Sequence, residues 1–456
     1  MKKVLLLSTV FIFAVSSLTA DFNRMGIPDS AEIRRSCAES WFYDDVKDLR
    51  EKRSELRKNA VGQEFQIRLE EAGNSFAVVI APQMKLDVDF YTENGIQQRT
   101  VDDYPGDAAG AWLLVRNALT GKPEQIKVYF TADSSVYIQL SPQNNKTLAD
   151  FIIDGLYAAR GVPVGVPFEN LYTASFQDII SLTEKSLPWQ YANTQKGQYQ
   201  SKLQMIGAIR KNLGRIAYMS DTCYDENGHL VYISDGSRRK IESNIDFSDM
   251  VLVDQCGFLK WIVDGLVEPL TGSKLYLKPL LVKTVEYDPL GLNGVLDQKE
   301  NLSYTLDWCR NLAAAHVSIR TKHNYMWNES GTDVAIEPFG SEVSSEGLSQ
   351  AAGYIKNTGY KISALRPILY VLAATEPAFG YLAAIKRPLR NNSKAPEFYK
   401  FDECAVIFPF FDENGRFSCV IFENGQELSL SAFVSKYPGC FVHLSRILTE
   451  TRFFPD

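Results

Sequence analysis

The chain has 456 residues, with 48 Lys or Arg against 55 Asp or Glu and a formal net charge of −7. A hydrophobic content of 45% excludes a disordered chain, and the acidic balance argues against a nucleic-acid-binding protein, because phosphate recognition needs a basic surface. Only four histidines are present and no two of the seven cysteines have C-x-x-C spacing, so we expect neither a metal site nor a cofactor.

The first twenty residues have the three-part pattern of a secretory signal peptide. Lys2 and Lys3 give a positive start, an apolar run extends over 4–18, and Ala20 offers a small residue for cleavage. The run is short for a membrane span, although an uncleaved N-terminal anchor is the alternative. We therefore expect removal of residues 1–20 and export to the periplasm or cell envelope of a bacterium, with no membrane span in the mature protein.

Residues 21–145 are predicted to form an N-terminal β-rich domain. After a charged, helix-forming stretch over 30–60, the hydrophobic period changes to two. Short apolar runs, separated by turn residues, cover 65–69, 76–80, 86–91, 112–115, 126–130 and 136–140. Short strands at this spacing are typical of a β-sandwich or a small barrel. Asp87 and Asp89 share one face of a predicted strand, and we expect that face to point to solvent.

Residues 146–196 are predicted to form a helical connector. Phe151, Ile152, Leu156 and Tyr157 favour a helix at its start. The stretch 161–167 is rich in Gly and Pro and cannot continue a helix, so an extended link is expected there. A second helix is expected over 175–187.

Residues 197–456 are predicted to form an α+β domain that ends in an antiparallel sheet. Helical periodicity predicts helices over 199–219, 257–268, 303–317, 346–357 and 363–375. Period-two segments predict hairpins around 225–228 and over 404–422, with a last strand over 440–448. Helices followed by a sheet make the whole chain α+β.

Cys256 is the strongest candidate for chemistry. It follows a short apolar run and directly precedes the predicted helix at 257–268. A Cys at a helix N-terminus gains from the helix dipole, which stabilises the thiolate that a nucleophile needs. A cysteine nucleophile also needs a His base on another element. The alternative is a buried structural thiol.

The segment Asp254 to Trp261 resembles the Asp-Cys-Ser-Gly-Phe motif of the NlpC-type cell-wall cysteine peptidases, which have a papain-like core. In that family the Cys heads a helix and the His follows at the start of a strand in a hairpin. The order in this chain is similar, with Cys256 before a helix and a hairpin at 404–422. The resemblance covers about 197–448 and implies a papain-like domain that handles peptidoglycan peptides.

The motif differs from the family pattern at both catalytic positions. When Gly257 is aligned with the motif, Gln255 takes the nucleophile's place and Cys256 the place of the Ser. The strand that should begin with the His contains Asp402 and Glu403 instead. His443, on the last predicted strand, is the candidate base for an active site with Cys256. The predicted binding residues are Asp254, Gln255, Trp261, Asp402 and Glu403.

Three hypotheses follow. The first is an exported envelope protein with a degenerate NlpC-like domain that binds peptidoglycan peptides or an envelope partner protein. The second is an active cysteine peptidase or amidase that acts on cell-wall peptides with Cys256 as nucleophile. The third is a structural or adhesive envelope protein unrelated to peptidases. The position of Cys256 relative to residues 402–404 and His443 discriminates between them.

Overall fold

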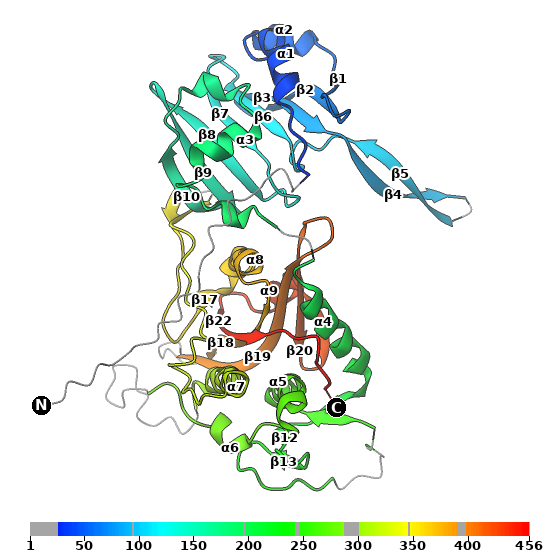
Figure 1. Ribbon diagram of the computed structural model, residues 1–456, viewed down its shortest axis with the longest axis vertical. Helices are drawn as coiled ribbons and strands as arrows, with labels where there is room; N and C mark the ends of the chain where they lie inside the picture. The colour runs from blue at the N-terminus through cyan, green and yellow to red at the C-terminus, as the bar shows by residue number, and fades with distance from the viewer. Residues whose placement is uncertain are drawn as a thin grey trace, which may run out of the picture.

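A computed structural model describes residues 26–93, 95–194, 197–241, 247, 249–286, 301–344, 347–389 and 398–455. The fold is α+β, as predicted, and consists of two large antiparallel sheets, each packed against helices (Figure 1). The predicted signal peptide, residues 1–20, lies outside the described residues. No helix of the described segments is both long enough and apolar enough to cross a membrane.

The first sheet has ten antiparallel strands in the order β1-β2-β3-β6-β7-β8-β9-β10-β15-β16. Their bounds are β1 (Glu55–Lys58), β2 (Glu64–Ala72), β3 (Ser75–Pro82), β6 (Trp112–Asn117), β7 (Pro123–Val128), β8 (Val136–Gln143), β9 (Lys146–Ile153), β10 (Leu156–Pro163), β15 (Ser341–Ser344) and β16 (Gly347–Gln350). Alternate residues such as Ile67, Val78 and Leu114 are buried, so one face of the sheet is apolar.

Helices cover this apolar face, and a second sheet does not. The helices with side chains in the same core are α1 (Ala31–Trp41), α2 (Val46–Glu51), η2 (Phe168–Leu171), α3 (Phe176–Thr183) and η3 (Trp189–Tyr191). Trp41 of α1 and Phe176 of α3 fill the space that a facing sheet would occupy. The predicted β-sandwich is therefore wrong for the described residues, although β2, β3, β6, β7 and β8 lie at predicted strand positions.

The prediction of a helix at the start of 146–196 is also wrong, because this segment forms β9 and β10. The two strands are joined by Asp154 and Gly155, both with positive φ, at +52° and +78°. Two such residues make the tight turn whose twist matches a hairpin. The first sheet therefore continues past the predicted boundary at residue 145. The helix predicted over 175–187 is confirmed by α3, which Ser175 caps by accepting a hydrogen bond from the amide of Asp178.

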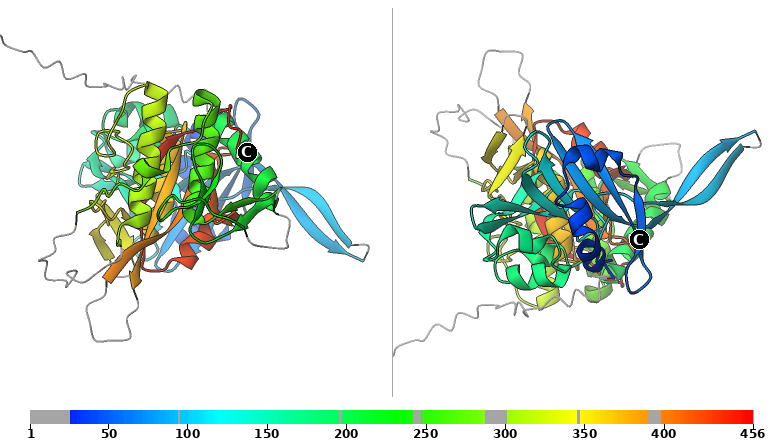
Figure 2. Two further views of the ribbon diagram at one scale, coloured as in Figure 1. Left: turned by 90° about the horizontal axis from the view of Figure 1, so that it is seen from below. Right: turned by 90° about the horizontal axis from the view of Figure 1, so that it is seen from above.

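A two-stranded hairpin projects from the first sheet. It consists of β4 (Met84–Thr92) and β5 (Gly95–Asp103), which pair only with each other among the described strands. Figures 1 and 2 show it extending away from the body of the molecule. We call this hairpin the arm. Asp87 and Asp89 lie on it and are exposed, as predicted.

The second sheet has six antiparallel strands in the order β17-β22-β18-β19-β20-β21. Their bounds are β17 (Tyr360–Lys361), β18 (Phe379–Leu389), β19 (Phe398–Phe411), β20 (Phe417–Glu423), β21 (Gln426–Ser429) and β22 (Phe441–Leu448). Helices α5 (Gln255–Thr271) and α7 (Tyr304–Thr321) cover one face, while α8 (Leu365–Thr375) and α9 (Leu430–Lys436) cover the other. The central strands are buried on both faces, which explains their nearly continuous apolar sequence.

Helix α8 also connects the two halves of the molecule. Its residues Ile368 and Leu372 pack on the second sheet, whereas Tyr370 and Val371 join the core under the first sheet. The strands β15 and β16 extend the first sheet, because β15 pairs with β10 and β16 pairs with β15. The helix predicted over 346–357 is therefore wrong, because its first residues form β16.

Shorter elements complete the second half. They are α4 (Gln200–Asn212), η4 (Leu213–Arg215), β11 (Ile216–Tyr218), β12 (Thr222–Tyr224), β13 (Leu230–Tyr232), β14 (Val251–Val253), α6 (Leu277–Leu280) and η6 (Ile362–Ala364). Strand β14 pairs in parallel with β11 and leads directly into α5. This connection positions the predicted site.

Candidate functional site

The start of α5 is held by a side-chain cap and by close packing. Asp254 caps the helix, accepting a hydrogen bond from the amide of Gly257 at 2.7 Å. A side chain at Gly257 would not fit, because a Cβ atom there would lie 2.2 Å from the carbonyl oxygen of Thr222. The helix therefore begins directly against β12, and this contact fixes the direction of the Cys256 side chain.

The Cys256 side chain points into the core. It is fully buried, and its Sγ lies 4.0 Å from the Sγ of Cys404 on β19. The hydroxyl of Tyr304 on α7 hydrogen-bonds the thiol, and the indole nitrogen of Trp308 donates to the Cys256 carbonyl at 2.8 Å. The thiol is closed off by two helices and the sheet.

The electrostatics around Cys256 oppose thiolate formation. Burial raises the pKa of this thiol well above its ordinary value, and the neighbouring Cys404 thiol and the Asp254 carboxyl raise it further. Burial also raises the pKa of Cys404 to about 11 and that of Asp254 to about 6. The helix dipole is worth about 0.3–1 kcal/mol at an exposed site, which does not offset full burial of a charge. Cys256 is therefore a structural thiol in this conformation.

His443 lies in a different cluster. Across β18, Ala384 pairs with Cys404 on one side and with His443 on the other, which separates the two by two strand spacings, about 10 Å. The Nε2 atom of His443 lies 3.4 Å from Asp333 and 3.4 Å from the guanidinium of Arg310. Burial lowers the pKa of His443 and so disfavours its charged form. The pairing of His443 with Cys256 is not formed.

Two of the predicted binding residues meet at the surface above the thiol. The side-chain amide of Gln255 donates a hydrogen bond to the carbonyl of Asp402. The Oε1 atom of Gln255 is buried and has no partner among the described residues. Arg387 holds the Asp402 carboxylate through two bonds of 2.8 and 2.7 Å and reaches Glu403 at 3.3 Å. The side-chain amide of Gln255 thus occupies the position of the nucleophile in the motif. The strand that would carry the histidine base carries the carboxylates of Asp402 and Glu403 instead.

A shallow depression opens at this point. It has a volume of about 360 Å³ and is lined by Asn301, Tyr304, Lys400 and Asp402. Only Asp402 was predicted from the sequence. Trp261 does not belong to this surface, because it is buried along α5 and stacks on Phe258 at 5.8 Å. Trp261 lies one helical turn after Gly257, so both residues are on the same face of α5, and that face packs against the protein core.

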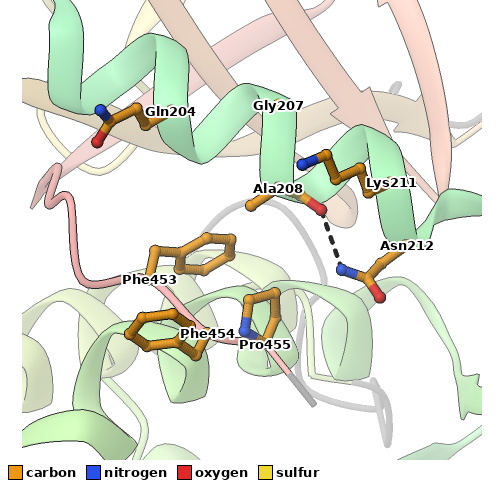
Figure 3. A pocket seen from close by; sticks show the side chains of 8 residues that line it. All are labelled: Gln204, Gly207, Ala208, Lys211, Asn212, Phe453, Phe454 and Pro455. Atoms are coloured by element: carbon orange, nitrogen blue, oxygen red, sulfur yellow. Dashed lines mark hydrogen bonds between the residues drawn. The ribbon is translucent and has the colours of Figure 1, made fainter.

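A second hollow lies between α4 and the C-terminal tail. Figure 3 shows its lining: Gln204, Gly207, Ala208, Lys211, Asn212, Phe453, Phe454 and Pro455. Its volume is about 470 Å³. The tail crosses α5 at Gly265, where a Cβ atom would lie 2.8 Å from the Phe453 ring. We call this hollow the α4–tail cleft.

The residues that a metal could use are dispersed. Within the described ranges, no group of three or more His, Cys, Asp or Glu side chains is arranged to hold a metal ion. All seven cysteines lie in these ranges, and none is disulfide-bonded. The geometry at α5 therefore offers hydrogen-bonding and charged groups for a ligand.

Comparison with known proteins gives one match. A sequence-family model described as "Domain of unknown function (DUF8515)" matches residues 23–191. This stretch covers the helices and strands from α1 to η3, including the arm. No curated protein and no solved structure matches the chain.

Proposed function

We propose that this protein is a non-catalytic binding protein of the bacterial cell envelope. In this proposal its second half is a papain-like domain, similar to the NlpC-type peptidases, that has lost the catalytic pair. The order of elements supports the resemblance, because a helix with a Cys near its start precedes an antiparallel sheet with a long hairpin. Export rests on the signal-peptide pattern of residues 1–20.

The observation that carries the proposal is the separation between the thiol and the surface. Cys256 is buried beneath Tyr304 and beside Cys404, while the depression outside it is lined by other residues, among them Lys400 and Asp402. Acyl transfer by a thiol needs a thiolate and a base, and a missing base alone costs about 10²–10⁴-fold in rate. The geometry thus supports binding in preference to hydrolysis.

The chemistry of the depression suits a short charged peptide. Lys400 provides a cation, and Asp402 provides an anion that Arg387 holds in place. Peptidoglycan peptides carry amines, carboxylates and amides in close succession, and such a ligand matches this set of groups. The alternative ligand is an envelope partner protein that carries a similar charged peptide segment.

Calorimetric titration with soluble muropeptides tests the proposal. We expect saturable binding, and mass spectrometry of the mixture should recover the muropeptide intact. Lys400→Ala should weaken binding about tenfold or more, because a hydrogen bond to a charged group is worth about 1.5–3 kcal/mol. The matched control is Lys146→Ala, at an exposed turn of the first sheet, which should leave affinity unchanged. An absence of binding at millimolar muropeptide, or equal loss in both variants, would refute it.

A further inference from the structure

The arm exposes apolar side chains, and their exposure to water is unfavourable unless another surface covers them. Its register places five apolar residues on one face, beside Gln97, Arg99 and Asp103: Met84, Leu86, Val88, Phe90 and Val101. The other face carries mainly charged and polar groups, including Asp87 and Asp89. A two-stranded hairpin is at best marginally stable alone in water, so an amphipathic hairpin that projects from its domain is expected to pack on a partner.

The tip of the arm is apolar on both faces. Phe90 lies on one face and is 42% exposed, whereas Tyr91 and Ile96 face each other on the opposite side and are 87% and 63% exposed. A flat surface would cover only one of these faces. The tip therefore fits a cleft that encloses it from two sides.

The net charge of the arm indicates which charge the residues around its binding cleft should carry. Residues 84–103 contain five acidic residues and two basic residues. This excess of negative charge disfavours an anionic membrane and favours an apolar cleft with a cationic rim.

The chain itself contains such a cleft. The α4–tail cleft is lined by Ala208, Phe453, Phe454 and Pro455, with Lys211 on its rim. Lys211 supplies the positive charge of the lining, because Lys202 of the same helix is buried and Arg210 is paired with Glu427. Phe454 is 63% exposed, so the cleft also has apolar surface to cover. The arm and the cleft are both apolar, and Lys211 offers one positive charge to the acidic arm.

We infer that the arm of one copy inserts its tip into the α4–tail cleft of a second copy, and that the exchange is reciprocal. Figures 1 and 2 show the arm and the C-terminal end on the same side of the molecule, so a two-fold axis on that side brings each arm to the other copy's cleft. Two equivalent contacts of this kind close a dimer. Phe90, Tyr91 and Ile96 are the anchors, while Asp89 and Lys211 supply the opposite charges at the rim.

Sedimentation velocity over a concentration series tests the inference. The full mature chain should dimerise with a dissociation constant in the micromolar range, because each contact is small. The double variant Phe90→Ser with Tyr91→Ser should be monomeric and should melt at the parent's temperature, since both side chains are exposed. The matched control, Leu119→Ser, removes an exposed apolar residue of another loop, 89% exposed, and should remain dimeric.

Charge exchange and cross-linking identify the contact itself. Asp89→Lys should weaken the dimer, and a mixture of Asp89→Lys chains with Lys211→Glu chains should recover it. In a mixture of Tyr91→Cys chains and Ala208→Cys chains, a short bismaleimide should link unlike chains. A parent that stays monomeric at about 100 µM would overturn the inference. The inference would also be overturned if the Phe90→Ser, Tyr91→Ser double variant still dimerised. It would be overturned as well if the protein dimerised but Tyr91→Cys and Ala208→Cys chains were not cross-linked.

Discussion

The thiol of Cys256, at the start of α5, lies 4.0 Å from the thiol of Cys404 on β19. The two residues are 148 positions apart in sequence. If the second half is an NlpC-type domain, as proposed, its histidine would lie at or near residues 402–404, and the structure has a second buried thiol there. Two neutral thiols shielded from water have no means of transferring a proton to and from a substrate.

The first prediction concerns thiol reactivity. Iodoacetamide should not label Cys256 in the native protein between pH 7 and pH 9, because the thiol is buried and its pKa is raised. Gln255→Cys should be labelled faster than Cys256, since Gln255 is half-buried whereas Cys256 is fully buried. Labelled peptides identified by mass spectrometry distinguish the two sites.

Rapid native labelling of Cys256, with an apparent pKa below about 7, would contradict the structural role of this thiol. Labelling that appears only in denaturant would support it. A Cys256→Ala variant provides the background for both measurements.

The second prediction compares two helical glycines, Gly257 near the start of α5 and Gly207 within α4. Gly257→Ala should destabilise the protein by about 2–3 kcal/mol, because the added Cβ would meet the Thr222 carbonyl at 2.2 Å. Gly207→Ala is the control, since nothing lies within 4 Å of its added Cβ on α4. This substitution should stabilise the protein by about 0.5–1 kcal/mol. Urea unfolding of both variants measures the difference, and equal effects would disprove the packing argument.

The sequence predicted the local elements of the site better than its surroundings. The helix after Cys256 and the hairpin over 404–422 were predicted because each has a strong local signal, a helical apolar period in one and an Asp-Glu-Asn-Gly turn in the other. The β9–β10 hairpin was missed, although Asp154-Gly155 is a recognisable turn, because the neighbouring apolar spacing imitates a helix.

The burial of Cys256 and the lining of the depression were not predictable from local patterns. Tyr304 and Cys404 come from elements distant in the chain, and Asn301, Lys400 and Arg387 have no motif around them. The pairing of β15 with β10 is a long-range contact of the same kind. Such contacts depend on how complete sheets and helices pack on one another, and this packing cannot be read from the hydrophobic period of a short segment.

The third prediction concerns the cluster around His443. Asp333→Ala should destabilise the protein by about 3–5 kcal/mol, because it leaves the buried guanidinium of Arg310 without the carboxylate that it contacts at 2.8 Å. Glu71→Ala removes the carboxylate of an exposed pair with Arg50 and should leave the unfolding midpoint unchanged. Chemical unfolding monitored by tryptophan fluorescence measures both. Similar midpoints for the two variants would show that the Arg310 cluster is not structural.

The fourth prediction concerns acid stability. Burial lowers the pKa of His316 to about 4, so the unfolded chain binds a proton at a higher pH than the folded chain does. The contribution of neutral His316 is therefore complete above about pH 6.5 and is lost as the pH falls toward 4. Stability should decrease by on the order of 2 kcal/mol between pH 7 and pH 5 from this group. His316→Leu should remove that part of the pH dependence, and an unchanged slope in urea unfolding would contradict the assignment.

The most direct test of the central claim is a single mixture of the protein with soluble muropeptides, followed both by calorimetry and by mass spectrometry. Binding without hydrolysis predicts a saturable heat signal that weakens in Lys400→Ala, while every muropeptide keeps its mass over hours. Cleavage products that form with the parent and disappear with Cys256→Ala would contradict it and establish a cysteine peptidase.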